Sequence, residues 1–457
     1  MTSLRTKTAL VWEPGGIFTE MAKRLAKDFG RVIYATDWVG SYPTSRGLVV
    51  GQGDPDFERV ADPWLYVDDA DIVVFPDVYN AGLHTYLRSQ GKRVWGCGAA
   101  GSMLELDRVA TKEMMAKAGL PVGGYTEISG VTALRKHLKA NKNQFVKLGG
   151  RNGERGDIET LSAPNYEHAE PVLDELEHRL GARAHVMEFV VEDAIDPAIE
   201  SGWDGVAIDG QFWSRTMCGI EKKDQAYVCK VIDRAQVPKQ VAAVNQAVAP
   251  YMKANQYRGC WSTEVRISPD GKGYLIDGTA RCGSPPSELM QIMCENLSEV
   301  IWEGADGVLL EPDFGDNKWG AEVLLHSTWA DQNYAHIRFP AEYRENIKLR
   351  HYTVIDGDIY VSPQATGMPE IGAVVATGKT AKEAIDRAKM IAEKVESHQL
   401  EIPVDAMDDA FEDLMQILGD KAGKPASKEQ IAAEDAVKAG KISQRQYERL
   451  AAKNDWN

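Results

Sequence analysis

The sequence of 457 residues has little positive charge and no long apolar run. Its 52 lysines and arginines are outnumbered by 68 aspartates and glutamates, which gives a formal net charge of -16. Nucleic acids and anionic membranes attract clustered Lys and Arg, so we expect neither as a partner. No apolar run approaches the ~20 residues that cross a bilayer, and the first residues lack the apolar core of a signal peptide. We therefore expect a cytoplasmic protein.

Metal-binding and redox motifs are also missing. The six cysteines form no Cys-x-x-Cys pair, and no histidines lie at zinc-ligand spacing. The nine histidines do not cluster and are interpreted as surface or core residues. The cysteines are interpreted as reduced thiols without an assigned role; they are Cys97, Cys218, Cys229, Cys260, Cys282 and Cys294.

The first hundred residues alternate between short apolar runs and segments with helical periodicity. Strands separated by helices predict a parallel sheet with crossover connections. The turn after the first strand, Pro14-Gly15-Gly16, lacks the Gly-x-Gly-x-x-Gly spacing of a dinucleotide-binding loop, so NAD binding is disfavoured. The expected strands are 8–12, 32–36, 71–75 and 93–96, and the expected helices are 18–29 and 79–90.

Beyond residue 103 the pattern changes to longer helices and paired strands. A long amphipathic helix is expected over 104–121, and Asp-Gly pairs at 270–271 and 356–357 predict β-hairpins. The polar tail after 405 is interpreted as small appended helices or a partly mobile extension. Other expected strands are 144–148, 185–191, 321–326 and 372–377, and other expected helices are 239–255 and 380–397. We expect domains at 1–103, 104–315, 316–402 and 403–457.

Lys147 is the first candidate for phosphate binding. It lies in the strand expected at 144–148, where an inward lysine is costly without an anionic partner. The next eight residues are rich in glycine and carry two arginines, so their amides and guanidinium groups can close over phosphates. Taken alone, this segment is better explained as a flexible hairpin tip. Its candidate residues are Gly149, Gly150, Arg151, Gly153, Arg155 and Gly156.

Two acids on the hairpin around 270–271 are the second candidate. Glu264 and Asp277 lie near the middle of its two strands. If both side chains point to one face, they can share a cation, because close carboxylates repel each other unless a metal neutralises them. Arg281 and Ser284 follow at once and place an anion-binding group beside that metal. The alternative is a pair of acids that face solvent on a surface hairpin.

The apolar strand that contains Glu188, Phe189 and Val190 is the third candidate. A flat apolar slot with free backbone polar groups suits adenine, and a nearby carboxylate can accept hydrogen bonds from ribose hydroxyls. Taken alone, this segment is only a buried strand end.

The order of these features resembles the ATP-grasp superfamily over about residues 5–400. The segment from Asp107 to Pro121 is similar to the helix that opens the family's ATP domain, with Arg108 where lysine is commoner. The resemblance implies an α/β (α+β) ATP-grasp fold, with an N-terminal Rossmann-like parallel-sheet domain and a C-terminal domain. Within the superfamily, the segment 371–384 and the run Glu221-Lys-Lys-Asp are similar to phosphoribosylamine–glycine ligases.

The same resemblance assigns roles to individual residues. Arg108, Lys147 and the glycine-rich segment resemble the phosphate-binding groups, and Glu188, Phe189 and Val190 resemble the adenine-binding hinge. Glu200 resembles the ribose-binding acid, with Glu192 as a rival, and either Lys222 or Lys223 resembles a later phosphate-contacting lysine. The implied metal ligands are Glu264, Asp277 and Thr279, and the implied catalytic residues are Arg281, Lys223 and Ser284.

The activity implied is that of an ADP-forming carboxylate–amine ligase that works through an acyl phosphate. ATP and Mg²⁺ (or Mn²⁺) are the expected cofactors, a small-molecule acid and amine are the expected substrates, and a homodimer is allowed. Residues 14–18 read Pro-Gly-Gly-Ile-Phe where phosphoribosylamine–glycine ligases have Gly-Gly-Arg-Glu-His, so the acid and the amine stay unnamed. The alternatives are a phosphotransferase or carboxylase-like enzyme with the same ATP site, and a non-catalytic nucleotide-binding protein.

Overall fold

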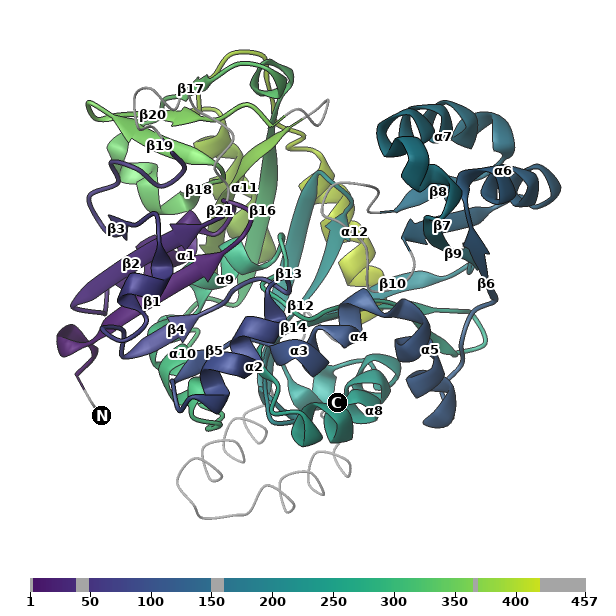
Figure 1. Cartoon of the computed structure of the whole chain (residues 1–457), viewed down its shortest axis with the longest axis horizontal. Helices are drawn as coiled ribbons and strands as arrows, with labels where there is room; N and C mark the ends of the chain where they lie inside the picture. The colour runs from purple at the N-terminus through teal and green to yellow at the C-terminus, as the bar shows by residue number, and fades with distance from the viewer. Residues whose placement is uncertain (1–2, 38–48, 149–159, 365–368, 420–457) are drawn as a thin grey trace.

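The computed structural model describes residues 3–37, 49–148, 160–364 and 369–419. They form a body built around two sheets and a smaller lobe that stands beside it (Figure 1). Within these ranges, no helix has the length and apolar character needed to span a bilayer.

The N-terminal sheet is parallel, which confirms the prediction from the alternating pattern. Its strand order is β3-β2-β1-β4-β5, and every neighbouring pair is parallel. The central strands are almost wholly buried, as expected for a parallel sheet covered by helices. The elements are β1 (Thr8–Glu13), α1 (Thr19–Ala26), β2 (Arg31–Thr36), β3 (Glu58–Arg59), β4 (Ile72–Val74), α2 (Ala81–Ser89) and β5 (Val94–Trp95).

The small lobe has its own hydrophobic core. Two helices cover an antiparallel sheet of order β6-β9-β7-β8, and apolar side chains such as Leu134, Leu173 and Phe189 fill the space between them. Short helices connect this lobe to the N-terminal sheet. The lobe consists of β6 (Tyr125–Ser129), α6 (Val131–Ala140), β7 (Gln144–Leu148), β8 (Leu161–Ala163), α7 (Tyr166–Leu180) and β9 (Glu188–Asp193). The connecting helices are α3 (Gly98–Gly101), α4 (Met103–Leu106) and α5 (Arg108–Lys117).

A large antiparallel sheet forms the centre of the body (Figure 1). Its main order is β15-β14-β10-β12-β13-β16-β21-β18, so it joins strands from both expected domains on either side of residue 315. Its strands are β10 (Ile199–Ile208), β11 (Gln211–Phe212), β12 (Arg215–Lys222), β13 (Ala226–Asp233), β14 (Arg258–Ile267), β15 (Gly273–Thr279), β16 (Trp319–Ser327), β18 (Ile347–Leu349), β21 (Glu370–Gly378) and β22 (Leu400–Glu401).

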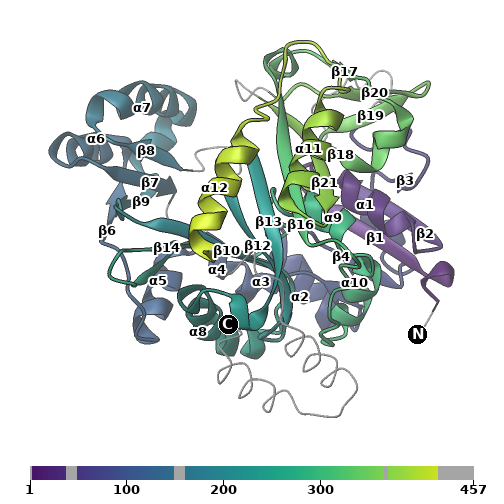
Figure 2. The same ribbon diagram turned by 180° about the vertical axis from the view of Figure 1, so that it is seen from behind.

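Helices cover both faces of the large sheet. α11 and α12 pack with Ala226 and Val323 on one face (Figure 2), whereas Cys229 contacts Met293 of α9 on the other. A small sheet of order β17-β20-β19 lies beside the N-terminal sheet. The remaining elements are α8 (Lys239–Ala254), α9 (Ser287–Met293), α10 (Leu297–Ala305), β17 (Ala335–Ile337), β19 (Tyr352–Ile355), β20 (Asp358–Val361), α11 (Ala381–Ala392) and α12 (Ala406–Leu418).

One expectation about helices needs correction. The single helix expected over 104–121 is wrong, because the chain breaks between α4 and α5 at Asp107, whose side chain caps α5. Within the expected tail, the chain forms the helix α12, which buries Met407, Ala410 and Leu414 against the core beside the large sheet. Residues 420–457 lie outside the described ranges.

Candidate functional site

The two predicted acids come together on the hairpin of β14 and β15. Its turn holds Gly271 at φ +79°, a conformation that glycine adopts without a Cβ clash. The register places Glu264 directly opposite Asp277. Opposed residues of antiparallel strands project to the same face, so both carboxylates lie on one side of the large sheet.

The electrostatic surroundings of these two carboxylates differ. Burial, followed by the negative charges of Asp277 and Glu200, raises the pKa of Glu264 well above its ordinary value. Burial alone would also raise the pKa of Asp277, but Arg108 and Lys147 outweigh it and hold that pKa below its usual range. Asp277 is therefore ionised, whereas Glu264 resists ionisation until further positive charge is nearby.

Arg108 is the cation in contact with Asp277. Its NH1 group donates a hydrogen bond to Oδ1 of Asp277 over 2.7 Å. Arg108 is the first residue of α5, and Asp107 caps that helix by accepting a hydrogen bond from the amide of Ala110. The break in the expected helix therefore positions Arg108 against β15.

Arg281 is held by Glu105, a residue that the sequence analysis missed. Oε1 of Glu105 accepts a hydrogen bond from Nε of Arg281 over 2.9 Å, and Oε2 accepts one from the amide of Ala280 over 2.7 Å. Burial raises the pKa of Glu105, and the charge of Arg281 opposes that rise. Glu105 lies three residues before Arg108, so the short segment around the helix break orients both arginines.

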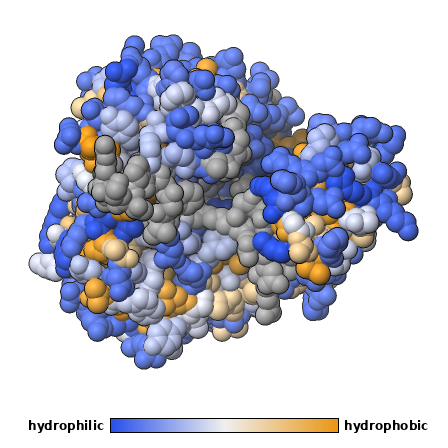
Figure 3. Space-filling model, turned by 45° about the horizontal axis from the view of Figure 1, so that its top comes forward, coloured by the Kyte–Doolittle hydropathy of each residue, from blue (hydrophilic) through white to orange (hydrophobic). Residues whose placement is uncertain are grey.

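Lys147 extends from the small lobe to the hairpin. Its ammonium group donates to the carbonyl oxygen of Ile276 over 2.6 Å and lies 3.7 Å from Oε2 of Glu192. Oε1 of Glu192 is 3.2 Å from Nζ of Lys112, a second residue that the sequence analysis missed. Lys112 follows Arg108 by one helical turn, and that i, i+4 spacing was an available signal. In the space-filling view a hollow separates the lobe from the body (Figure 3).

Strand β9 brings only some of the predicted adenine-binding side chains to this region. Phe189 packs in the core of the small lobe. Val190 is opposite Lys147 in the strand register and is buried. Because side chains alternate along a strand, Val190 and Glu192 share a face, and Phe189 points away from it. Glu188 is exposed at the beginning of the strand.

Both candidates for the ribose-binding acid lie near Lys147. Glu192 pairs with Lys147 directly, and Glu200 is opposite Arg266 in the register of β10 and β14. Burial raises the pKa of Glu200, whereas the charges of Arg266 and Lys147 lower it. The choice between Glu192 and Glu200 therefore stays open.

Lys222 and Lys223 have different surroundings. Nζ of Lys222 lies 2.6 Å from Oδ2 of Asp413 on α12, which covers the face away from the acids. Burial raises the pKa of Glu264 and also that of Glu221, and the charge of Lys223 opposes both rises. Lys223 is thus the lysine on the side of the acids.

The remaining predicted residues fall in three places. Thr279 follows Asp277 by two residues on β15, so both lie on one face. The hydroxyl of Ser284 contacts Glu288 and Arg350, which the sequence analysis did not select. The glycine-rich segment (Gly149, Gly150, Arg151, Gly153, Arg155 and Gly156) lies outside the described residues.

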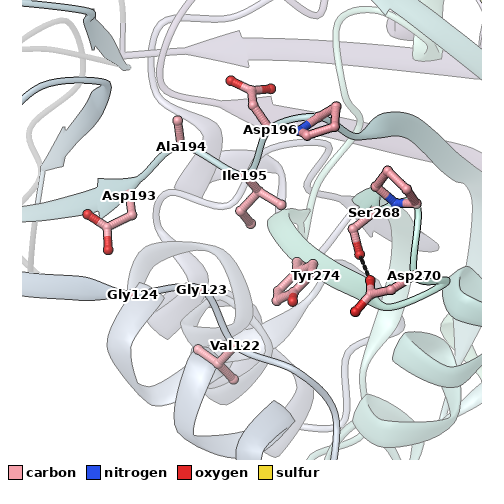
Figure 4. Close-up of a pocket in the computed structure, with 12 residues that line it drawn as sticks. Val122, Gly123, Gly124, Asp193, Ala194, Ile195, Asp196, Ser268, Asp270 and Tyr274 are labelled. Atoms are coloured by element: carbon pink, nitrogen blue, oxygen red, sulfur yellow. Dashed lines mark hydrogen bonds between the residues drawn. The ribbon is translucent and has the colours of Figure 1, made fainter.

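A cavity of about 420 Å³ lies beside the connection between the small lobe and the large sheet (Figure 4). Its charged lining residues are Asp193, Asp196 and Asp270, and no lysine or arginine of the described chain lines it. Phosphate binding requires cations or converging amides, so this cavity is distinct from the candidate phosphate site around Lys147.

The acid pair fits a magnesium ion that also binds phosphate. Mg²⁺ commonly uses one or two protein carboxylates together with substrate phosphates. Among the described residues there is no group of three or more His, Cys, Asp or Glu side chains able to hold a metal. Glu264 and Asp277 would therefore supply two ligands, and the rest would come from the nucleotide, from water or from Thr279.

No protein-family model matches the chain. The phosphoribosylamine–glycine ligase of Nostoc sp. is 24% identical over 264 residues, which are 54% of this chain and 61% of that protein. The chain thus covers less than two thirds of that relative's length.

Solved structures agree with the chain over most of its length. Phosphoribosylamine–glycine ligase from Thermotoga maritima gives a TM-score of 0.61 at 17% identity and covers 86% of this chain and 98% of its own. The biotin carboxylase domain of 2-oxoglutarate carboxylase from Hydrogenobacter thermophilus was solved with MgADP and bicarbonate. It gives a TM-score of 0.63 at 14% identity and covers 90% of this chain and 98% of its own. The chain has the ATP-grasp fold, and its sequence is similar to that of phosphoribosylamine–glycine ligases.

Proposed function

We propose that the chain is an ADP-forming ligase that activates a small-molecule carboxylate with Mg-ATP and joins it to an amine. The observation that carries this proposal is the opposed pair Glu264 and Asp277, with Arg108, Lys147 and Arg281 acting on the charge of Asp277. Paired acids for a metal and converging cations for phosphate are the two requirements of phosphoryl transfer.

The charges of these side chains indicate a separate role for each of them. Arg108 and Lys147 approach Asp277 and the carbonyl oxygen of Ile276, so an incoming nucleotide would exchange these contacts for phosphate oxygens. Glu264 and Asp277 would hold Mg²⁺, which would neutralise the β- and γ-phosphates when bound. Electrostatic stabilisation of the transferring phosphoryl group is then the main catalytic contribution of these side chains.

Arg281 is placed to bind the acid substrate. Its side chain is half-buried, and two contacts orient its guanidinium group: Nε donates to Glu105 over 2.9 Å, and NH1 donates to the carbonyl oxygen of Cys282 over 3.4 Å. A guanidinium group can bind a carboxylate or an acyl phosphate through two parallel hydrogen bonds. Ser284, three residues later, would lie on the same side of the substrate.

Nucleotide products and an acyl phosphate trap test this proposal. The purified chain would be incubated with Mg-ATP, a pool of carboxylic acids and hydroxylamine, and the products separated by mass spectrometry. We expect ADP and phosphate together with the hydroxamate of one acid. Formation of AMP and pyrophosphate would contradict the proposal.

A carboxylase-like enzyme is the second candidate, because the fold also matches a biotin carboxylase domain solved with bicarbonate. Bicarbonate-dependent release of ADP without any hydroxamate from the acid pool would favour it. A homodimer also stays a prediction, and light scattering of the purified chain would test it.

A further inference from the structure

A second group of acids lies on the large sheet, beside the predicted ATP site. Glu322 on β16 has no exposed surface. Among the described residues, neither of its carboxylate oxygens has a hydrogen-bond donor within reach. A buried carboxylate without a donor is costly whether it is ionised or protonated, so Glu322 needs a partner.

The neighbours of Glu322 do not supply that partner. Burial raises the pKa of Glu322 well above its ordinary value, and the charges of Glu288, Glu370 and Glu221 raise it further, against the opposing charge of Arg350. The guanidinium group of Arg350 is already shared, because it lies 3.1 Å from Glu288 and 2.5 Å from Glu370. One arginine cannot neutralise three carboxylates, so all three are ionised together only when a further cation is nearby.

This acidic group, which consists of Glu288, Glu322 and Glu370, adjoins the site of the proposed reaction. Ser284 connects them, because it contacts Glu288 and Arg350 and follows Arg281 by three residues. Glu322 is opposite Tyr227 on β13, and Tyr227 is opposite Glu221 on β12, so the acids run across one face of the sheet towards Glu264. Ser284 and Glu370 are half-buried, so the acidic group reaches solvent there.

We propose that the acidic group binds the protonated amino group of the amine substrate, with Glu322 as its inner acceptor. An ammonium group carries up to three donors and one positive charge, which matches the unpaired oxygens of Glu322 and supplies the cation that lets the three carboxylates be ionised together. A metal ion is a poorer match, because no three acids of the described chain are arranged to hold one. An anion is repelled. This inference rests on the proposed ligase function and deepens it by locating the second substrate.

Binding without ATP tests the inference separately from the ATP chemistry. The Tm of the full chain would be measured in the presence of ethanolamine and of each of the common α-amino acids, and in parallel with their N-acetyl derivatives. We expect at least one amine to raise Tm, and its N-acetyl derivative to have no effect because it lacks the charge. If no amine in the set raises Tm, the inference is overturned.

The protecting amine would then be titrated against variants. Glu322→Gln should require at least tenfold more amine for half of the Tm shift, whereas Glu342→Gln, at an exposed position, should match the unaltered chain. Equal protection of Glu322→Gln overturns the inference. If Glu322→Gln does not fold, Glu370→Gln, at a half-buried position, replaces it with the same expectation. Amine binding with no ADP formation in the hydroxylamine assay would count against the proposed function, whereas ADP and hydroxamate formation without amine protection would count against this inference alone.

Discussion

Asp277 lies directly opposite Glu264, yet the pKa values of the two carboxylates are shifted in opposite directions. Burial and like charge raise the pKa of Glu264, whereas Arg108 and Lys147 lower that of Asp277 despite its burial. One acid is thus matched by cations in the protein, and the other needs positive charge from outside. This asymmetry gives the site a reason to take up a metal ion with its nucleotide.

Neutralising each acid should therefore change stability with opposite sign. Asp277→Asn removes a charge-assisted hydrogen bond from Arg108 and should lower the free energy of unfolding by about 1.5–3 kcal/mol. Glu264→Gln removes a carboxyl group that the folded, metal-free chain must keep protonated, so it should leave stability unchanged or raise it. Urea unfolding of the metal-free variants measures both effects. Destabilisation of equal size in both variants would contradict the asymmetry.

Both variants should nevertheless lose turnover. Each removes one of the proposed metal ligands, and the loss of one preorganised electrostatic group typically costs about 10²-fold or more. Steady-state ADP release as a function of Mg²⁺ concentration would measure the change. Full activity with unchanged magnesium dependence in Asp277→Asn would remove the metal assignment.

Glu105 should act as a positioning residue for Arg281. Glu105→Gln keeps the size of the side chain but has one acceptor oxygen for two donors, Nε of Arg281 and the amide of Ala280. We expect turnover to fall about 10-fold or more through misplacement of Arg281, while KM for ATP stays unchanged. Glu113→Gln, on the exposed side of α5, is the matched control and should behave like the unaltered chain. A proportional rise in KM for ATP would instead place Glu105 in nucleotide binding.

Local sequence patterns predicted the strands and the hairpin that carry the site residues. Strand β7 begins and ends at the residues predicted from the sequence, 144 and 148, and the Asp-Gly turn predicted the hairpin that carries Glu264 and Asp277. These features depend on neighbouring residues, so one segment of sequence contains the signal for each. The break at Asp107 was missed because a capped pair of helices and one long helix share the same apolar periodicity.

Contacts between distant segments could not be predicted in the same way. Glu105 and Arg281 are 176 residues apart, and nothing in either segment indicates the other. In the sequence, Glu322 is an ordinary residue of a strand. Its lack of a hydrogen-bond donor is seen only in the folded chain, where α9 and β21 bring the acids Glu288 and Glu370 beside it. A buried polar group without a partner is a property of the packed structure.

Adjacent lysines offer a matched test of which side chain contacts phosphate. Lys223→Met should lower turnover roughly tenfold or more, because it removes positive charge from the side of Glu264 and Glu221. Lys222→Met should keep turnover and lose at most ~1 kcal/mol of stability, the usual worth of a partly exposed ion pair such as that with Asp413. Initial rates and thermal melts of both variants measure these effects. The reverse pattern would assign the phosphate contact to Lys222.

Stability of the ligand-free chain should fall as pH rises towards 7. Burial, with the charges of Asp224 and Glu200, raises the pKa of Glu221 to about 7, against the opposing charge of Lys223. Between the ordinary glutamate pKa of about 4.3 and this value, the unfolded state binds fewer protons than the folded state, so the free energy of unfolding decreases with pH. The contribution of Glu221 is fully lost above pH 7 and amounts to about 4 kcal/mol. Urea unfolding at pH 5.5 and 7.5 should show a smaller decrease for Glu221→Gln than for the unaltered chain. Equal decreases in both would show that Glu221 ionises normally in the folded protein.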